Sequence, residues 1–481
     1  MKFYLTAAIP YVNAKPHIGH ALEFVQGDVI ARAHRERGDE TYYITGADEN
    51  SLKNVQAAEK EGVTTQALCD RNAQAFIELG NLYNISLDAF QRSSAPDHFS
   101  SAQELWKLCE AAGDIYKKKY KGLYCVGCEA FYTPDELNDH GECFEHPGRK
   151  LDEIEEENYF FKLSKYQDEL RKLIENDEFL ITPAHKKNEA LGFIKQGLQD
   201  FSISRSKERA RGWGVPVPGD PDQIMYVWFD ALNVYRSAAP AWWPAKLHII
   251  GKGIIRFHAV YWPAILLSAK IALPKELFVH GYITINGQKM SKTVGNVVDP
   301  VELIKKYGID PVRYYLLREI PSTDDGDFSE EKFRLRYNAD LANGLGNFAS
   351  RVLTLAEKMN PWSLDVSHAS LDVAHAIREV RDEAARALDE RRLHDALAHL
   401  WRLVSFGDKF VNATKPWELD DADPKKRLFL ADLLILLDTL SVLLRPYLPD
   451  TAAAIAKCIT KNGSLLTNTA KPGAPLFSRL V

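Results

Sequence analysis

Short apolar runs alternate with amphipathic stretches in the first part of the chain. Residues 3–9 and 41–45 are short and apolar, as in buried strands, whereas residues 18–35 have the hydrophobic spacing of a helix. Three further strands are predicted at 225–229, 247–250 and 277–279. Strands that alternate with helices favour right-handed crossovers, so the pattern predicts an α/β domain with a parallel sheet.

This pattern changes twice along the chain. Residues 113–205 contain a cysteine cluster, a basic run at 117–119 and an acidic run at 152–157, which indicates an insertion. From about residue 341 the spacing becomes purely helical, and one stripe of it contains Leu393, Leu397, Leu400 and Val404. The sequence therefore predicts a parallel-sheet domain split by an insertion and followed by a helical bundle.

The most apolar later stretch, residues 428–444, is a candidate membrane span. It contains Asp432 and Asp438 and ends at Arg445-Pro446. A membrane span needs about 20 residues with few charges. We therefore interpret this stretch as a buried bundle helix and expect no membrane association.

Composition narrows the class of protein further. A chain of 481 residues is too long for one core, and 46% hydrophobic with 26% charged residues is typical of a globular protein. The net charge of −6 argues against a nonspecific nucleic-acid coat but allows RNA binding on a locally basic face. Six cysteines are too few for a disulfide scaffold, and the first residues lack a secretory signal. We expect a cytoplasmic protein.

The segment Pro16-His17-Ile18-Gly19-His20 follows the first predicted strand and opens the first predicted helix. His17 and His20 are three residues apart, so they lie on one helical face at the positive end of the dipole, where a triphosphate can bind. Gly19 leaves room for a flat base to lie against the backbone. Taken alone, the segment is explained equally well by two surface histidines and a helix-start glycine.

A second candidate element follows the turn Asn286-Gly287. The run Lys289-Met290-Ser291-Lys292-Thr293 places two lysines around a small residue. Such a loop can move over a triphosphate and neutralise charge that develops at the transferring phosphoryl group. A lysine-rich loop alone is usually a solvated turn, but the two elements in this order indicate one ATP site.

The two elements resemble the HIGH and KMSKS motifs of the class I aminoacyl-tRNA synthetases, with Thr293 in place of the final serine. The resemblance implies a Rossmann-like catalytic domain in which the α-carboxylate of an amino acid attacks the α-phosphorus of ATP, with Mg²⁺ on the pyrophosphate. The catalytic residues that it implies are His17, His20, Lys289 and Lys292. The ATP-binding residues that it implies are His17, Gly19, His20, Gly251, Lys289 and Lys292.

Four further segments resemble the methionyl members of this class: residues 8–13, 46–49, 227–231 and 257–263. The resemblance covers essentially the whole chain and implies L-methionine, ATP and tRNA(Met) as ligands. The implied methionine-binding residues are Ile9, Tyr11, Asp48, Trp228, Ala231, Tyr235, Ile254 and His258.

This set of residues suits a thioether substrate. Methionine is apolar and polarisable, and each sulfur–aromatic contact contributes roughly 0.3–1.5 kcal/mol. Tyr11, Trp228 and Tyr235 are expected to form an aromatic box. We also expect His258 to place an N–H near the sulfur, and Asp48 to pair with the substrate ammonium. Taken singly, these aromatic residues are explained more simply as core residues of a sheet domain.

Some positions depart from the methionyl pattern. The departures are Ala14 for glycine, Asn50 for histidine, Leu232 for proline and Gly253 for aspartate. They affect the fine geometry expected of the pocket rather than the activity.

The cysteine cluster has the spacing of a metal site. Cys125-x₂-Cys128 and Cys143-x₂-His146 are two short ligand pairs separated by a loop, which suits a closed tetrahedral zinc site of structural type. His140 is a rival fourth ligand with a less suitable spacing. The site resembles the zinc knuckle of the methionyl connective insertion, and the insertion is too short for the editing domain of the isoleucyl, valyl and leucyl enzymes.

The helical region is expected to bind the tRNA anticodon. Asn347 and Arg351 are four residues apart on one helical face, and Trp417 offers a ring at a helix end. RNA loops are bound by stacking splayed bases on aromatic rings, at about 1–3 kcal/mol per base. Asn347 as a helix cap and Trp417 as a packing residue are the alternatives. Because the chain ends at Val481 without an additional module, we expect a monomer.

Five segments are therefore expected. They are 1–112 and 206–281 as the two halves of the catalytic domain, 113–205 as the connective insertion with the zinc knuckle, 282–340 as a stem-contact region with the lysine loop, and 341–481 as an all-α anticodon-binding bundle.

Three other functions are consistent with parts of the sequence. A cysteinyl enzyme would use its zinc to bind the substrate thiol, but here the ligand pairs lie together in the insertion. A non-catalytic tRNA-binding relative would not need His17, His20, Lys289 and Lys292. A smaller nucleotidyltransferase would need neither the zinc site nor the bundle.

Overall fold

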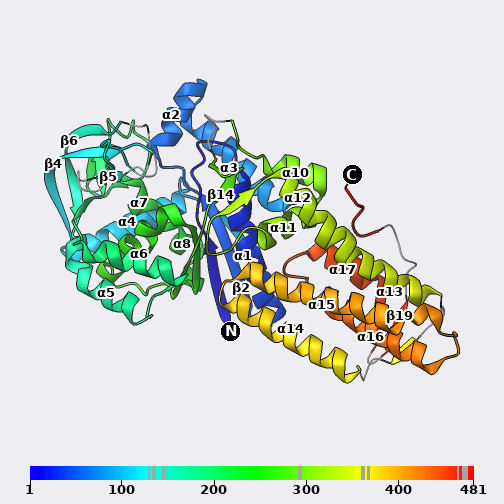
Figure 1. The fold of residues 1–481 in the computed structure, drawn as a ribbon. Coiled ribbons are helices and arrows are strands. Elements are labelled where there is room, and N and C mark those ends of the chain that lie inside the picture. Colours follow the sequence, from blue (N-terminus) through cyan, green and yellow to red (C-terminus); the bar gives the residue numbers. More distant parts are fainter. Residues whose placement is uncertain are drawn as a thin grey trace. The chain divides into compact units, whose positions relative to one another are not determined.

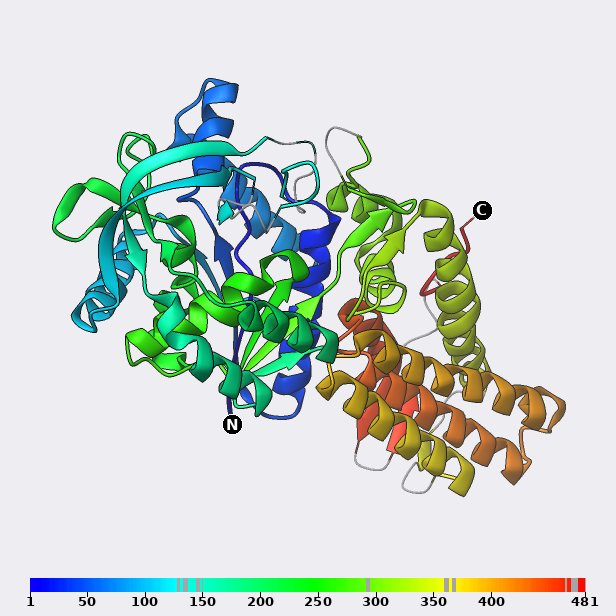
Figure 2. The same ribbon diagram turned by 60° about the vertical axis from the view of Figure 1, so that its left-hand side comes forward.

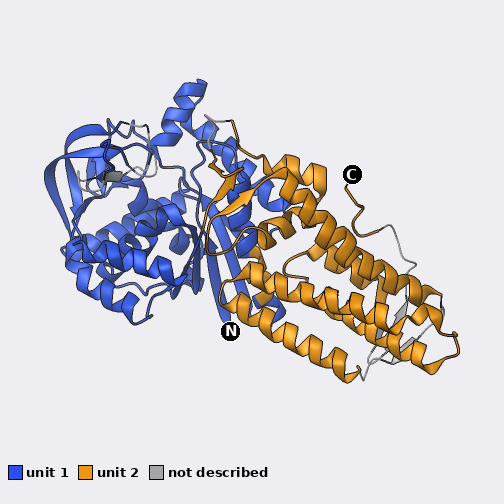
Figure 3. Cartoon of the chain, viewed as in Figure 1, with its two compact units in different colours: residues 1–27, 34–280 blue, residues 28–33, 281–481 orange. Residues whose placement is uncertain are grey.

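The computed structural model describes residues 1–481 apart from 128–129, 133–136, 144–147, 149, 291–294, 359–362, 366–368, 463–464, 469–474 and 481. The chain forms two compact units (Figure 3). Unit 1 comprises residues 1–27 and 34–280, and unit 2 comprises residues 28–33 and 281–481.

Unit 1 is built around a parallel sheet (Figure 1). The strand order of this sheet is β3-β2-β1-β12-β13-β7. Its strands are β1 (Lys2–Ala7), β2 (Glu40–Ala47), β3 (Ala89–Arg92), β7 (Leu180–Thr182), β12 (Leu247–Gly251) and β13 (Glu276–His280). The helices of its first half are α1 (Ile18–Glu36), α2 (Leu52–Glu61), α3 (Thr65–Leu82) and α4 (Pro96–Ala111). Strand β1 lies between β2 and β12, so the direction in which successive strands are added to the sheet reverses at β1. Parallel sheets bind ligands at the carboxyl ends of the strands at this point of reversal.

Four of the five predicted strands and the first predicted helix are confirmed. The strands are nearly continuous apolar runs because both faces of a parallel sheet are covered, and Leu5, Ile249 and Phe278 are fully buried. The strand predicted at 225–229 is wrong. Strand β11 (Asp220–Met225) ends there and the short helix α7 (Val227–Ala231) begins. A short buried apolar run has no periodicity that separates a strand from a helix.

The segment 113–205 contains a long antiparallel pair, β4 (Ile115–Cys125) and β6 (Asp152–Phe161). The basic and acidic runs of the sequence lie on the two paired strands and meet at one end, where Lys119 is opposite Glu157. Two smaller strands extend this sheet, β5 (Ala130–Tyr132) and β8 (Phe201–Ser202). Strand β7 of the same segment instead joins the main sheet beside β13.

The remaining elements of unit 1 are short. They are η2 (Leu163–Tyr166), α5 (Gln167–Glu175), α6 (Ala184–Lys195), α8 (Val234–Ser237), η3 (Pro240–Trp242), η4 (Lys252–Ile254), η5 (Phe257–Tyr261) and α9 (Trp262–Ser268). A three-stranded sheet of β10 (Pro216–Val217), β11 and β9 (Ser204–Ser206) completes the unit.

Unit 2 begins with a small sheet and continues as helices (Figure 2). The sheet consists of β15 (Gln288–Lys289), β14 (Ile283–Ile285) and β16 (Gly326–Phe328). The helices are α10 (Pro300–Tyr307), α11 (Ile309–Arg318), α12 (Glu330–Arg336), η6 (Tyr337–Gly346), α13 (Asn347–Glu357), α14 (Leu371–Asp389), α15 (Leu393–Thr414), η7 (Pro416–Glu418), α16 (Pro424–Leu443) and α17 (Pro449–Cys458).

The predicted bundle is confirmed with one correction. The stripe of Leu393, Leu397, Leu400 and Val404 is buried on α15, and the apolar stretch at 428–444 lies on α16 and its C-cap residue Leu444. The region from 341 is not purely helical, because β17 (Ser363–Asp365), β19 (Leu465–Asn468) and β18 (Ile459–Asn462) form an antiparallel sheet. These strands are only three or four residues long, too short for a clear period of two. No helix in the described part of the chain is long and apolar enough to cross a membrane.

Candidate active site

The candidate methionine-binding residues of the first half follow the carboxyl ends of neighbouring strands. Ile9 and Tyr11 follow β1, and Asp48 follows β2. Tyr11 and Asp48 form an isolated parallel bridge, and the backbone N–H of Asp48 donates to the carbonyl of Pro10 at 2.9 Å. These contacts continue the β1–β2 pairing past the sheet edge and fix both residues beside each other.

Aromatic rings form the wall of the site. The ring of Trp228, in α7, meets Tyr11 edge-on at 6.2 Å and stacks on Phe257 at 3.8 Å between centroids. Ile9, Tyr11 and Ile254 are partly buried and pack against the core cluster that contains Trp228, Ala231 and Tyr235. The structure thus brings together the aromatic and aliphatic residues that the sequence predicted for the pocket.

His258 forms a buried pair with Tyr235. Its Nδ1 lies 3.0 Å from the carbonyl oxygen of Ile254, which can only accept, so Nδ1 carries the proton. Its Nε2 lies 2.8 Å from the Tyr235 hydroxyl and accepts a hydrogen bond from it. Burial lowers the pKa of His258 to about 4 and raises the pKa of Tyr235 well above its ordinary value. Both groups are therefore neutral at physiological pH.

This geometry corrects one detail of the prediction. The only N–H of neutral His258 is bound to Ile254, so it is not available to the substrate sulfur. The hydroxyl of Tyr235 also accepts a hydrogen bond from the backbone N–H of Ile9. The pair saturates its own polar atoms with protein partners and leaves an apolar surface, which suits a thioether.

The two candidate histidines stack at the start of α1. Their ring centroids are 3.8 Å apart at an interplanar angle of 27°. The backbone N–H of Gly19 donates to Nδ1 of His17 at 3.2 Å, and the backbone N–H of His17 donates to Nδ1 of His20 at 3.1 Å. Because each Nδ1 accepts a bond, the proton of each neutral ring lies on Nε2. The pair has the N–H donors that an anionic oxygen at this helix start requires.

The other candidate ATP residues lie on two elements. Gly251 is the last residue of β12, at the predicted strand end. Lys289 lies in β15, after a hairpin turn in which Asn286 and Gly287 both have positive φ values (51° and 75°), as a two-residue turn requires. Lys292 lies outside the described residues.

Asp327 fixes this hairpin turn. Its Oδ1 accepts the backbone N–H of Gly287 at 2.6 Å and the hydroxyl of Thr284 at 2.8 Å. Partial burial acts to raise the pKa of Asp327, but these hydrogen bonds and Lys332 outweigh it and lower that pKa below its ordinary value. The base of the candidate lysine loop is thus held by an ionised carboxylate.

Three polar contacts near the pocket were missed by sequence reasoning. The Lys53 ammonium lies over the Tyr11 ring, 3.9 Å from its centroid. Asn50 donates to Asp230 Oδ2 at 2.6 Å, and His98 is hydrogen-bonded to the other oxygen of this fully buried carboxylate. Asn50 is one of the departures from the methionyl pattern, and that departure was the only signal in the sequence. Here it links the end of β2 to the helix that carries Trp228.

Two candidate zinc ligands lie together in the structure. The sulfurs of Cys125 and Cys143 are 3.2 Å apart and both residues are buried. This distance is far beyond the roughly 2.05 Å of a disulfide, so the two thiols are not joined to each other and lie close enough together to be candidate ligands of one metal ion. Cys128 and His146 lie outside the described residues, and the described residues alone contain no cluster of three or more potential ligands.

Two of the three candidate anticodon residues in unit 2, Arg351 and Trp417, come together. Arg351 donates to Asn412 Oδ1 at 2.7 Å and lies 3.5 Å from the carboxylate of Asp408. Its guanidinium is 5.8 Å from the centroid of the Trp417 ring, which is 47% exposed. Asn347, exposed, begins α13, the helix that carries Arg351. We call Arg351 and Trp417 the Arg351–Trp417 patch.

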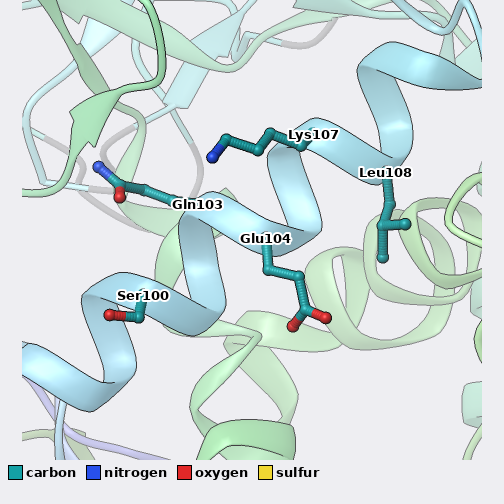
Figure 4. A pocket seen from close by; sticks show the side chains of 5 residues that line it. All are labelled: Ser100, Gln103, Glu104, Lys107 and Leu108. Carbon is teal, nitrogen blue, oxygen red and sulfur yellow. The ribbon is translucent and has the colours of Figure 1, made fainter.

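A separate pocket of about 380 Å³ lies on one face of α4 (Figure 4). Its lining side chains are Ser100, Gln103, Glu104, Lys107 and Leu108. None of them was predicted as a site residue, and they share one helix face because their spacing is three or four residues.

The parallel sheet, the histidine pair at its first helix and the lysine-bearing hairpin define a class I aminoacyl-tRNA synthetase. A family model described as tRNA synthetases class I (M) matches residues 3–353, and the chain belongs to this family. It is 42% identical to a methionine–tRNA ligase of Brucella suis, over 94% of this chain and 90% of that protein. It is 39% identical to that of Thermotoga maritima, over 100% of this chain and 80% of that protein.

Solved structures give the same result. Mycobacterium tuberculosis methionyl-tRNA synthetase in complex with methionyl-adenylate matches with a TM-score of 0.93 and 37% identity, over 99% of this chain and 100% of that one. The free form of the same enzyme matches with a TM-score of 0.85 and 34% identity, over 100% and 98% of the two chains.

Proposed function

We propose that the protein is a methionine–tRNA ligase that charges both initiator and elongator tRNA(Met). It activates methionine with ATP to methionyl-adenylate and pyrophosphate, and then transfers methionine to the 3′ end of the tRNA. The observation that carries this proposal is the saturated Tyr235–His258 pair beside Tyr11 and Trp228, at the carboxyl ends of β1, β2 and β12. The stacked histidine pair opens the helix that follows β1.

In the first step an oxygen of the methionine carboxylate attacks the α-phosphorus of ATP. The bond from this phosphorus to the bridging oxygen breaks, and pyrophosphate leaves. Mg²⁺ bound with ATP would neutralise charge on the pyrophosphate. We assign the Nε2–H groups of His17 and His20 to the phosphates, where preorganised donors stabilise developing charge. We assign Gly19 and Gly251 to the nucleotide and Lys289 and Lys292 to a loop over the phosphates.

Methionine recognition combines one charge with an apolar wall. We assign Asp48 to the substrate ammonium, because it is a buried carboxylate fixed beside Tyr11. Tyr11, Trp228 and the Tyr235–His258 pair face the thioether, and the gaps are filled by Ile9, Ala231 and Ile254. Because the pair has no N–H to spare, a substrate with a polar side chain would lose hydrogen bonds to water without replacement.

We propose a structural zinc ion in the insertion, held by Cys125, Cys128, Cys143 and His146. The 3.2 Å separation of two buried thiol sulfurs supports this assignment. Metal analysis of the purified protein tests it: one zinc per chain is expected, and a Cys125→Ser variant should lose the zinc and unfold at lower temperature. Zinc retained at full stoichiometry in that variant would contradict the ligand set.

We further propose that Asn347, Arg351 and Trp417 bind the anticodon. The contact of the Arg351 guanidinium with a half-exposed ring supports this role, because stacked bases are bound by such surfaces. We also propose that the enzyme is a cytoplasmic monomer and that its chain is divided into the five segments predicted from the sequence.

ATP–pyrophosphate exchange on the purified protein tests the proposed function. It should be measured separately with methionine, cysteine, leucine, isoleucine and valine. Exchange that depends on methionine alone supports the pocket assignment. Exchange with another of these amino acids would be consistent with the fold and the reaction class but would contradict the assignment of the pocket to methionine. An absence of exchange with all five would favour a non-catalytic tRNA-binding protein.

A further inference from the structure

A groove in unit 2 lies outside every residue assigned above. It is a pocket of about 500 Å³ lined by residues from α11, α12, η6, α14 and α15, and we call it the α15 groove. Helices α14 and α15, which contribute most of the lining residues, pack side by side (Figures 1 and 2). Its lining residues include Arg318, Arg336, Trp401, Arg402, Ser405 and Lys409.

The carboxylates of the groove are bound by its own arginines. Asp340 accepts hydrogen bonds from Arg336 at 3.1 Å and from the hydroxyl of Tyr314 at 2.7 Å. Glu379 is bound by Arg402. The lining carboxylates therefore have cationic or hydroxyl partners, which offsets their repulsion of an anion.

Two cations of the groove have no such partner. Arg318 lies at the end of α11, and Lys409 is exposed on α15. Within the described part of the chain, neither side chain forms an ion pair or a hydrogen bond. The uncommitted charges of the groove are therefore both positive. Groups of this kind, with a nearby serine hydroxyl, bind phosphate oxygens in protein–nucleic acid complexes.

The groove continues along α15 into the Arg351–Trp417 patch. Arg402, Ser405 and Lys409 follow each other at intervals of three and four residues, so they form one stripe on the helix. Asn412, which holds Arg351, lies one turn beyond Lys409. From Arg402 to Asn412 the helix rises roughly 15 Å, a length that accommodates more than one nucleotide.

We propose that the α15 groove binds backbone phosphates of the tRNA next to the anticodon. The inference rests on the proposed function, since it places the anticodon bases on the Arg351–Trp417 patch. Phosphate contacts fix register and orientation but carry no sequence information. The groove thus contributes affinity to any RNA of the same shape, whereas the patch contributes the selection of bases.

The test compares tRNA binding by the full-length protein with single and double substitutions. Lys409→Ala, Arg318→Ala and the double variant remove the uncommitted charges. Arg378→Ala is the matched control. Arg378 is exposed on α14 two residues from Ala376 and from Val380, which line the groove, and therefore about 200° around the helix from each.

We expect each single substitution to raise the KM for tRNA several-fold and to leave methionine-dependent exchange unchanged. Removing one phosphate contact should also reduce the slope of the logarithm of the tRNA association constant against the logarithm of the salt concentration by about 0.7–0.9. The double variant should reduce this slope by about twice as much. The loss should be equal for a tRNA whose anticodon bases have been replaced. Arg378→Ala should match the wild type in all of these measurements.

Three results would overturn the proposal. The first is an unchanged KM and salt slope in the double variant. The second is a loss that disappears when the anticodon bases are replaced. The third is stabilisation of the wild type, but not of the double variant, by millimolar inorganic phosphate with no change in tRNA binding, which would define a small-anion site.

Lys409→Gln separates a binding effect from damage to the fold, because this side chain is exposed. A several-fold higher KM with unchanged thermal unfolding supports the groove, and an unchanged KM overturns it. Failure of the groove proposal can be distinguished from failure of the proposed function. In the second case the wild type itself would not charge tRNA(Met).

Discussion

The proposed methionine pocket of unit 1 and the Arg351–Trp417 patch of unit 2 use polar groups in opposite ways. In the pocket, His258 and Tyr235 are buried and satisfy each other and the backbone. In the patch, the Trp417 ring is 47% exposed and lies beside a guanidinium. We propose that the Tyr235–His258 pair discriminates by offering no hydrogen-bond donor to a wrong side chain, whereas the patch offers stacking and charge to a partner.

This difference predicts which variants will separate stability from function. A buried donor or acceptor left without a partner costs about 1–3 kcal/mol, whereas an exposed ion pair contributes about 0–1 kcal/mol. Changes in the pocket should therefore reduce both stability and amino acid activation. Changes in the patch should reduce tRNA charging alone.

The largest effect is expected for a histidine of unit 1 that we assign to the phosphates of ATP. His20→Ala removes one Nε2–H donor at the start of α1, and loss of one preorganised donor to a developing charge typically costs 10²–10³-fold in rate. We expect methionine-dependent exchange to fall by about that factor, with thermal unfolding little changed. His375→Ala is the control, because this histidine is 76% exposed on α14. Wild-type exchange in His20→Ala would remove His20 from the site.

The second effect concerns the pH dependence of stability. The pKa of His258 is about 4 in the folded protein because burial disfavours its charged form, and about 6.5 in the unfolded chain. The unfolded chain therefore gains a proton first, and the free energy of unfolding should fall between pH 6.5 and 4, by up to roughly 3 kcal/mol.

Chemical denaturation at several pH values measures this contribution. His258→Gln removes the titrating group, so its free energy of unfolding should fall less steeply than that of the wild type between pH 6.5 and 4. Above pH 6.5 the two curves should run parallel. Equal slopes across the whole range would mean that His258 is not held neutral by burial.

The sequence predicted those features that depend on local spacing. The helix at 18–35, the buried stripe on α15 and the histidine pair three residues apart follow from helical periodicity. The strand predicted at 225–229 was wrong, because a short apolar run has the same appearance in a strand and in a helix such as α7.

Contacts between distant segments could not be predicted from spacing. The bond from His258 to Ile254 fixes the tautomer, and the positions of Lys53 over Tyr11 and of Asn50 beside Asp230 depend on tertiary packing. Motif resemblance supplied the identities of the pocket residues, but the roles of their polar atoms required the structure.

Tyr235→Phe sharpens the comparison within the pocket. The substitution leaves Nε2 of His258 buried without its donor, so we expect a loss of about 1–3 kcal/mol in stability and a higher KM for methionine. The KM for ATP should change little. Tyr116→Phe is the matched control, because its hydroxyl donates to Asp200 at a half-buried position of the insertion. If Tyr235→Phe matched the control in both stability and KM, the saturation argument would be wrong.

Trp417→Ala tests the patch and should have the smallest effect on the enzyme as a whole. Loss of one stacked base costs about 1–3 kcal/mol, so the KM for tRNA(Met) should rise about tenfold. Methionine-dependent exchange and thermal unfolding should stay at wild-type values, because the exposed ring contributes little to the core. Leu428→Ala on α16 is the control, because Leu428 is apolar and 65% exposed. It should change neither the KM for tRNA(Met), nor methionine-dependent exchange, nor thermal unfolding. If exchange fell together with charging in Trp417→Ala, this residue would act through the fold, and the division between a saturated pocket and an open patch would not hold.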